Sequence, residues 1–119
     1  MQNSPKNLYK KLLGLKGEKM AEKALKKQGY KIILNNYVTP FGEADIVCSK
    51  DGAICFAEVK TRTSKKFGEP SQAVDYKKRE KYRKIALYYL NSNHLEEVLV
   101  TFIVVEVLGE EINIITDAF

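Results

Sequence analysis

A predicted β-hairpin within residues 41–62, FGEADIVCSKDGAICFAEVKTR, constrains the fold of this chain most strongly. The apolar runs ADIVC and AICFAEV flank the segment SKDG, and an Asp-Gly pair is a strong short-range signal for a tight hairpin turn. Charged side chains nevertheless stand where a strand prefers β-branched or aromatic residues, at Glu43, Asp45, Glu58 and Lys60. Their positions require a chemical explanation.

The expected register brings these charges together. If the Asp-Gly pair forms a two-residue turn, Asp45 faces Glu58 and Glu43 faces Lys60. Because side chains alternate across a strand, all four then point to the same side of the sheet. Like charges directly opposite one another destabilise a sheet, so two facing carboxylates need a cation or a proton between them.

This arrangement predicts a site for a hard divalent metal. Mg²⁺ takes oxygen ligands, is often held by one or two carboxylates and keeps waters that a phosphate can displace. Such a metal polarises a phosphoryl oxygen and acidifies a bound water, and Lys60 on the same face can orient that water or neutralise charge on phosphorus. We therefore expect Asp45, Glu58 and Lys60 to be the catalytic groups of phosphodiester cleavage, with Mg²⁺ as cofactor and Mn²⁺ as its substitute. Ion pairs at the strand ends, Asp45 or Glu58 with Lys60, are the alternative.

The rest of the chain predicts a mixed α/β domain. Helical patterns and β-rich apolar stretches alternate along the chain, with helices at 7–28 and 70–91 and further strands at 30–38, 98–107 and 112–119. With the hairpin, the order is α-β-β-β-α-β-β, which indicates a mixed sheet flanked by helices. The stretch 98–107 is almost entirely apolar, as is typical of a strand covered on both faces. A chain of 119 residues is expected to form a single domain, 1–119.

The amino-acid composition limits the partners, the compartment and the enzyme classes that we expect for this chain. The net charge of +5, from 20 Lys and Arg against 15 Asp and Glu, suits a polyanion such as nucleic acid. No apolar run has the length of a membrane helix, and the N-terminus does not resemble a secretory signal, so we expect no membrane association. Cys48 and Cys55 are expected to be unbridged core thiols in a cytoplasmic protein, on the side of the hairpin away from the acids. His94 is the only histidine and no Gly-rich phosphate loop follows a strand, which argues against triad hydrolases and nucleotide-binding enzymes.

Two segments of the hairpin carry a family resemblance. GEAD at 42–45 and EVKTR at 58–62 resemble the signature of the PD-(D/E)xK nuclease superfamily. More closely, the chain is similar to the YraN family of small bacterial endonuclease-like proteins, which are related in fold to archaeal Holliday-junction resolvases. The likeness runs from about Lys16 to the end of the chain and includes GEKMA at 17–21 and PSQAV at 70–74.

The resemblance implies a restriction-endonuclease-like core and a nuclease that cleaves DNA, including branched or junction DNA. It implies that Glu18 completes the metal site with Asp45 and Glu58, and that Gln72 is a polar residue near the catalytic centre. It also makes a homodimer plausible, since junction-cleaving relatives pair two sites. Ala44 stands where the superfamily name has its proline, a loosely kept position. A nucleic-acid-binding adaptor with the same fold and little or no cleavage is the alternative function, and a purely structural domain is a third.

Two basic segments are candidates for phosphate contacts. A predicted loop at 61–69 follows the acid-x-lysine element directly and carries Arg62, Lys65 and Lys66. The predicted second helix carries six cations among residues 77–84, beginning with Lys77 and Lys78. A charge run on a helix is also typical of an ordinary solvated face, so the loop is the stronger candidate.

Overall fold

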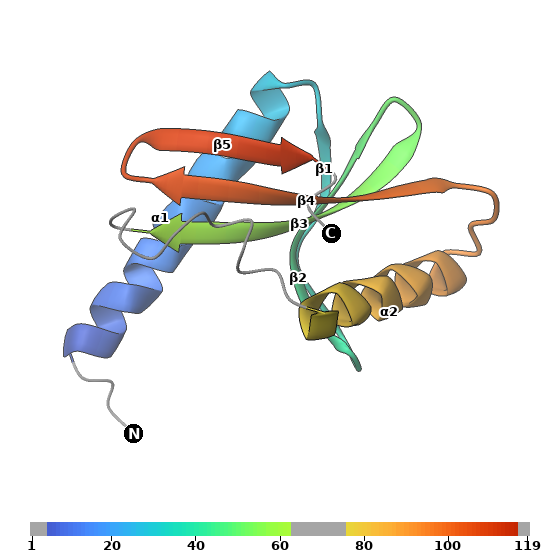
Figure 1. The fold of residues 1–119 in the computed structure, drawn as a ribbon, viewed down its shortest axis with the longest axis horizontal. Coiled ribbons are helices and arrows are strands. Elements are labelled where there is room, and N and C mark those ends of the chain that lie inside the picture. Colours follow the sequence, from blue (N-terminus) through green and yellow to red (C-terminus); the bar gives the residue numbers. More distant parts are fainter. Residues whose placement is uncertain (1–4, 63–75, 117–119) are drawn as a thin grey trace.

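The computed structural model describes residues 5–62 and 76–116, which form two helices and five strands (Figure 1). The elements follow the predicted order, with bounds α1 (Pro5–Lys27), β1 (Lys31–Thr39), β2 (Gly42–Lys50), β3 (Ala53–Arg62), α2 (Tyr76–Ser92), β4 (Leu99–Leu108) and β5 (Glu111–Thr116). The predicted α/β fold class is therefore confirmed. Most of the predicted loop at 61–69 and the predicted helix start at 70–75 lie outside the described residues, and the first two loop positions instead end β3.

The five strands form one mixed sheet in the order β1-β2-β3-β4-β5. Neighbouring strands are antiparallel except β3 and β4, which run parallel and are connected through the segment that contains α2. A parallel pair needs such a long connection, and its strands are usually covered on both faces. Residues 103–107 of β4 are all buried, as the apolar stretch predicts.

Each helix covers its own face of the sheet. Ala21 and Leu25 of α1 belong to one buried cluster, together with residues of β2, β3 and β4. Tyr82, Ile85 and Tyr89 of α2 belong to a second cluster with residues of β2 and β3. The central strands therefore have an apolar layer on each side, and the two faces can be distinguished by the helix that covers them.

The alternation of β3 decides which face receives the acid-x-lysine element. Cys55 and Ala57 belong to the cluster under α1, whereas Phe56 belongs to the cluster under α2. Continuing the two-residue period places Glu58 and Lys60 on the α2 face. The prediction that the cysteines face away from Glu58 is confirmed.

The two cysteines are opposite one another in the β2–β3 register and both are free thiols, as predicted. The Thr101 hydroxyl donates a hydrogen bond to the Cys55 sulfur over 2.9 Å. Neither described helix is long and apolar enough to span a membrane.

A glycine allows α1 to approach the end of β3 closely. A Cβ atom at Gly17 would overlap the side chain of Thr61, whereas one at Gly14 would have no neighbouring atom of a described residue within 4 Å. Because β3 carries the acid-x-lysine element just before Thr61, this contact fixes α1 against the strand that holds the candidate site.

We predict that Gly17→Ala lowers the free energy of unfolding by about 1–3 kcal/mol, since overpacking outweighs the better helix propensity of alanine. Gly14→Ala is the matched control and should stabilise the protein by roughly 0.5–1 kcal/mol. Denaturant unfolding of both variants measures the difference. Adding Thr61→Ala to Gly17→Ala should recover the loss, and a Gly17→Ala variant as stable as Gly14→Ala would show that the contact is unimportant.

Candidate active site

The site begins where β2 and β3 separate. The ladder runs from Lys50 opposite Ala53 to Ile46 opposite Ala57, in the predicted register, and ends there. The predicted ladder pairs beyond this point, Asp45 with Glu58 and Glu43 with Lys60, are therefore wrong. The turn fixes the register near the tip of the hairpin, but it does not keep the strands paired at their far ends.

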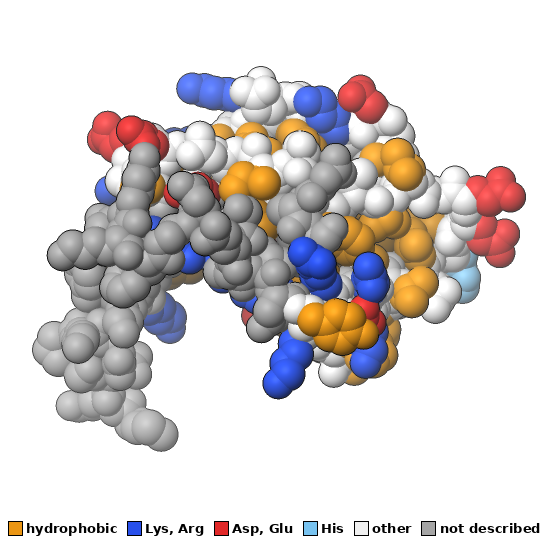
Figure 2. Space-filling model, in the orientation of Figure 1, with side chains coloured by type: hydrophobic (Ala, Val, Ile, Leu, Met, Phe, Trp, Pro, Cys, Tyr) orange, Lys and Arg blue, Asp and Glu red, His pale blue; other side chains and the backbone are white. Residues whose placement is uncertain are grey.

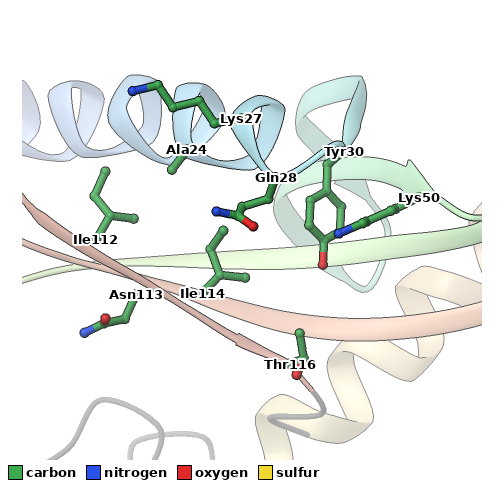
Figure 3. Close-up of a pocket in the computed structure, with 9 residues that line it drawn as sticks. All are labelled: Ala24, Lys27, Gln28, Tyr30, Lys50, Ile112, Asn113, Ile114 and Thr116. Carbon is green, nitrogen blue, oxygen red and sulfur yellow. The ribbon is translucent and has the colours of Figure 1, made fainter.

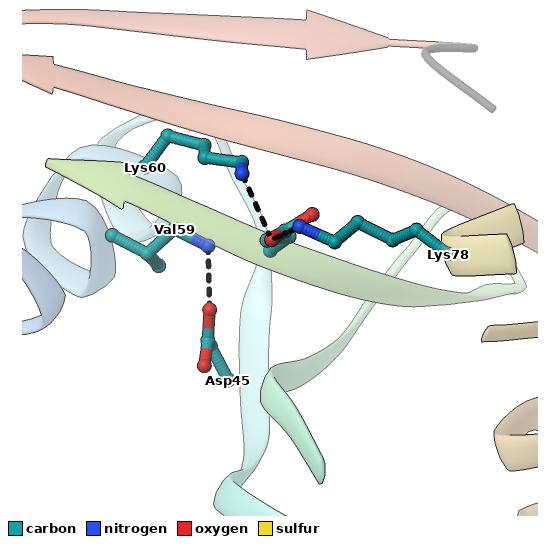
Figure 4. A network of polar contacts seen from close by, with 5 residues as sticks. Asp45, Val59, Lys60 and Lys78 are labelled. Carbon is teal, nitrogen blue, oxygen red and sulfur yellow. Dashed lines mark hydrogen bonds and ion pairs between the residues drawn. The ribbon is translucent and has the colours of Figure 1, made fainter. Parts of the chain in front are cut away.

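Asp45 makes a different contact with β3. Its carboxylate accepts a hydrogen bond from the backbone N–H of Val59 over 2.7 Å (Figure 4). Continuing the register would have placed Ala44 opposite Val59, so the Asp45 side chain satisfies an amide that the departing strand leaves open. Asp45 is thereby held beside the residue that follows Glu58.

A local irregularity gives Asp45 this position. Ala44 packs under α2 and Ile46 packs under α1, although residues two apart on a regular strand share a face. The paired strand β1 is irregular at the same level, because Asn36 has a φ of 52° between Asn35 and Tyr37. Asparagine tolerates this left-handed conformation better than most residues. The Asn-Asn pair in a predicted strand was the only sequence signal for this feature.

Glu58 lies in a buried, positively charged setting on the α2 face. Its Oε1 atom lies 3.4 Å from Nζ of Lys60 and 2.5 Å from Nζ of Lys78 (Figure 4). Its Oε2 atom is buried and accepts no hydrogen bond from the described residues. A buried carboxylate oxygen without a partner costs free energy, so this atom is a candidate ligand for a cation or a donor from a bound molecule.

Glu18 approaches Asp45 from α1, as the family resemblance implies. The two side chains line a pocket of about 170 Å³ together with Asn35, Asn36 and other residues. Burial raises the pKa of Glu18, the charges of Asp45 and Glu43 raise it further, and a hydrogen bond with Asn36 lowers it. Asn36 is thus a site residue that sequence reasoning missed.

The pKa of Asp45 is also raised, chiefly because the carboxyl group is buried. The Val59 amide opposes this shift, the negative charges of Glu58 and Glu43 add to it, and the positive charge of Lys81 lowers the pKa again. Burial lowers the pKa of Lys60, with the nearby Lys78 as the next cause, while Glu58 opposes the change. The site thus holds several charges at close quarters in a partly dry environment.

These groups fit Mg²⁺ in part. Glu58 offers a buried oxygen that no described residue contacts through a hydrogen bond, and Asp45 lies near enough for the two carboxylates to interact. Mg²⁺ commonly uses only one or two carboxylates. However, residues 5–62 and 76–116 contain no group of three or more His, Cys, Asp or Glu side chains arranged to hold a metal ion. Glu18 is therefore close to Asp45 but is not part of a closed three-carboxylate cage.

The predicted phosphate-binding residues are only partly described. Lys77 is exposed on α2, and Lys78 contacts Glu58 instead of pointing away from the site. Arg62 ends β3, and its Nε atom is buried without a hydrogen-bond partner among the described residues. Gln72, Lys65 and Lys66 lie outside the described residues.

A separate pocket of about 440 Å³ lies between the end of α1 and β5 (Figure 3). Lys27, Lys50 and Tyr30 are among its lining residues, and the Lys50 ammonium lies 4.9 Å from the centre of the Tyr30 ring. None of the described residues that line it carries a carboxylate, so this pocket lacks the ligands that a hard metal ion prefers.

The comparison with known proteins identifies a family. The model of "Uncharacterised protein family UPF0102" matches residues 17–107, a range that contains Glu18, Asp45, Glu58 and Lys60. A UPF0102 protein of Syntrophomonas wolfei is 45% identical over 111 residues, which cover 90% of this chain and 96% of the relative. A UPF0102 protein of Caldanaerobacter subterraneus is 40% identical over 121 aligned positions, covering 96% and 99% of the two chains.

We predict that Asp45→Asn, without metal, unfolds a few degrees above the wild type at about pH 7. Since the folded-state pKa of Asp45 lies above its unfolded value, the folded state binds the proton more tightly, and wild-type stability rises as pH falls through that pKa. The advantage of Asp45→Asn should therefore shrink on acidification. Thermal unfolding at a series of pH values, without metal, measures both effects.

Asp51→Asn changes an exposed carboxylate in the turn of the same hairpin, so it is the matched control and should unfold like the wild type. Strong destabilisation of Asp45→Asn at neutral pH would mean that the Asp45 charge holds the fold together, and would contradict a site built for a cation.

Proposed function

This chain belongs to the protein family UPF0102, and we propose that it is a Mg²⁺-dependent nuclease that hydrolyses phosphodiester bonds in DNA. The observation that carries the proposal is that Asp45 and Glu58 lie close together at the point where two strands separate, and that one buried Glu58 oxygen has no hydrogen-bond partner among the described residues. The mixed sheet with a helix on each face supports the further proposal of a restriction-endonuclease-like core in the PD-(D/E)xK superfamily.

Each side chain has a distinct role in this proposal. Asp45 and Glu58 would hold the metal, with Glu18 as a third candidate ligand beside Asp45. When bound, Mg²⁺ supplies a Lewis acid for a phosphoryl oxygen and acidifies a coordinated water. Lys60, next to Glu58, neutralises negative charge that develops on the phosphate or orients the attacking water. Its lowered pKa follows from burial, and a partly dry site strengthens that electrostatic interaction.

DNA binding is supported by the cations beside the site. Lys77 and Lys78 lie in the first turn of α2, and lysine and arginine side chains are grouped with hydrophobic ones along the surface of this helix (Figure 2). Arg62 follows Lys60 by two residues, and Lys65, Lys66 and Gln72 are included in the proposal from sequence alone. Such contacts to phosphates are independent of base sequence and weaken with salt. Branched or junction DNA as substrate, and a homodimer that pairs two sites, extend the proposal.

We place the protein in the cytoplasm, where a reducing environment suits two free thiols.

One observation favours the second candidate function, a nucleic-acid-binding adaptor with little or no cleavage. Lys60 and Lys78 already balance the charge of Glu58, so the site is electrostatically satisfied in part without a divalent ion. An adaptor would bind DNA equally well with or without metal and would leave it intact.

We predict that Asp45→Asn and Glu58→Gln abolish Mg²⁺-dependent nicking, because each removes a charged ligand. Lys60→Ala should lower the rate by roughly 100- to 1,000-fold, as expected for the loss of one electrostatic stabiliser, while leaving metal affinity almost unchanged. Asp51→Asn should nick at the wild-type rate. A nicking assay on branched and linear DNA, with Mg²⁺ or with chelator, measures all four variants.

All four variants should bind DNA within about threefold of the wild type, since phosphate contacts supply most of the affinity. Equal nicking by Asp45→Asn and the wild type would exclude the proposed site. If the wild type and all four variants bind DNA but none of them nicks it, in Mg²⁺ or in Mn²⁺, the protein is an adaptor instead.

A further inference from the structure

A hollow with aromatic walls lies between α2 and the turn that joins β1 to β2. It has a volume of about 430 Å³ and is lined by Phe41, from the turn between β1 and β2, and by the α2 residues Lys84, Leu87, Tyr88, Asn91 and Ser92. We call it the Phe41 pocket. The Phe41 and Tyr88 rings meet edge to face, with centroids 6.2 Å apart and an interplanar angle of 73°. Phe41 and Tyr88 remain 48% and 37% exposed, so both rings have apolar surface available for contact.

The polar groups of the Phe41 pocket favour an anionic ligand. The Lys84 ammonium lies 6.0 Å from the centre of the Phe41 ring. Asn91 and Ser92 contribute hydrogen-bonding groups at the other end, and none of the described lining residues carries a carboxylate. A flat apolar group with a negatively charged substituent therefore matches the lining better than a purely apolar or a cationic ligand.

The same flank of α2 connects the pocket with the active site. Lys77, Lys81, Lys84 and Tyr88 follow one another at intervals of three or four residues, so they line one side of the helix. Lys81 lies against Gly42, where an added Cβ would come within 2.8 Å of its side chain, and its charge lowers the pKa of Asp45. The absence of a side chain at Gly42 thus lets Lys81 pack against the turn that carries Phe41, close enough to Asp45 for its charge to act on that carboxyl group.

We propose that the Phe41 pocket binds an unpaired nucleotide of a DNA strand, with the base on Phe41 and Tyr88 and its phosphate beside Lys84. This inference rests on the proposed nuclease function and names its substrate class, which is DNA with a single-stranded segment next to the cleaved bond. Exposed aromatic rings beside lysines bind single strands with little sequence preference, because every base has a face that can stack. A fully paired duplex offers phosphates to the lysines but no free base to the rings.

Charge complementarity also selects this occupant over a second copy of the chain. A two-fold interface through the Phe41 pocket would bring the Lys77, Lys81 and Lys84 stripe close to its own copy, and like charges across an interface are costly. A nucleic-acid strand instead places phosphates along the same stripe.

The test measures DNA binding without metal, so it does not depend on cleavage. Fluorescence anisotropy in chelator compares a duplex with a flap of the same sequence, and 2-aminopurine in the unpaired segment reports stacking through quenching. We expect Phe41→Ala to weaken flap binding about tenfold and to relieve the quenching, while duplex affinity changes less than twofold. Lys84→Gln should weaken binding to both DNAs. Val38→Ala is the control, since it also shortens an exposed apolar side chain on β1 and should bind like the wild type.

Phe41→Leu keeps an apolar side chain but removes the ring, so it should show the same loss even if Phe41→Ala fails to fold. Wild-type affinity and quenching in Phe41→Leu would overturn the proposal. A second result would also overturn it. If the wild type self-associates in sedimentation, and Phe41→Leu loses this self-association while it binds the flap as the wild type does, the pocket serves a second copy of the chain. Flap binding that depends on Phe41 in a protein that never nicks would refute only the nuclease function.

Discussion

The hydrogen bond from the Val59 amide to the Asp45 carboxylate is the interaction on which the candidate site depends. An antiparallel ladder normally satisfies such an amide with a main-chain carbonyl, and then the strands stay about 5 Å apart with no room between them. Here a side chain accepts the bond, so β2 can leave β3 while Asp45 stays attached to it. The ladder between β2 and β3 therefore ends just before Glu58, and the bond keeps Asp45 beside the residue that follows Glu58.

Charge balance around Glu58 explains how a buried carboxylate is tolerated at this position. Lys60 and Lys78 both contact Oε1 of Glu58. Removing one partner of a buried ion pair generally lowers stability far more than removing one partner of an exposed pair. Oε2 has no hydrogen-bond partner among the described residues, so it can accept a further cation. A divalent ion and a phosphate arriving together would let the lysines turn from Glu58 toward the phosphate oxygens without leaving any charge uncompensated.

Local rules predicted much of the fold, and long-range contacts decided the rest. The Asp-Gly turn fixed the pairing of Cys48 with Cys55, because register near a two-residue turn follows from the turn itself. The end of the ladder was not predictable in this way, since it depends on the positive φ of Asn36 and on the packing of both helices. The contact of Lys78 with Glu58 joins residues 20 positions apart and has no periodic signature. The sequence therefore predicted Lys78 as a phosphate-binding residue and did not predict its ion pair.

The most direct test of this account is the anomalous difference density of crystals soaked in Mn²⁺. We expect a peak between the carboxylates of Asp45 and Glu58, with Oε2 of Glu58 among the ligands, and no peak in crystals of Asp45→Asn. Saturating Mn²⁺ that leaves this space empty, with Lys60 and Lys78 still on Glu58, would contradict the claim that the opening between β2 and β3 is a metal site.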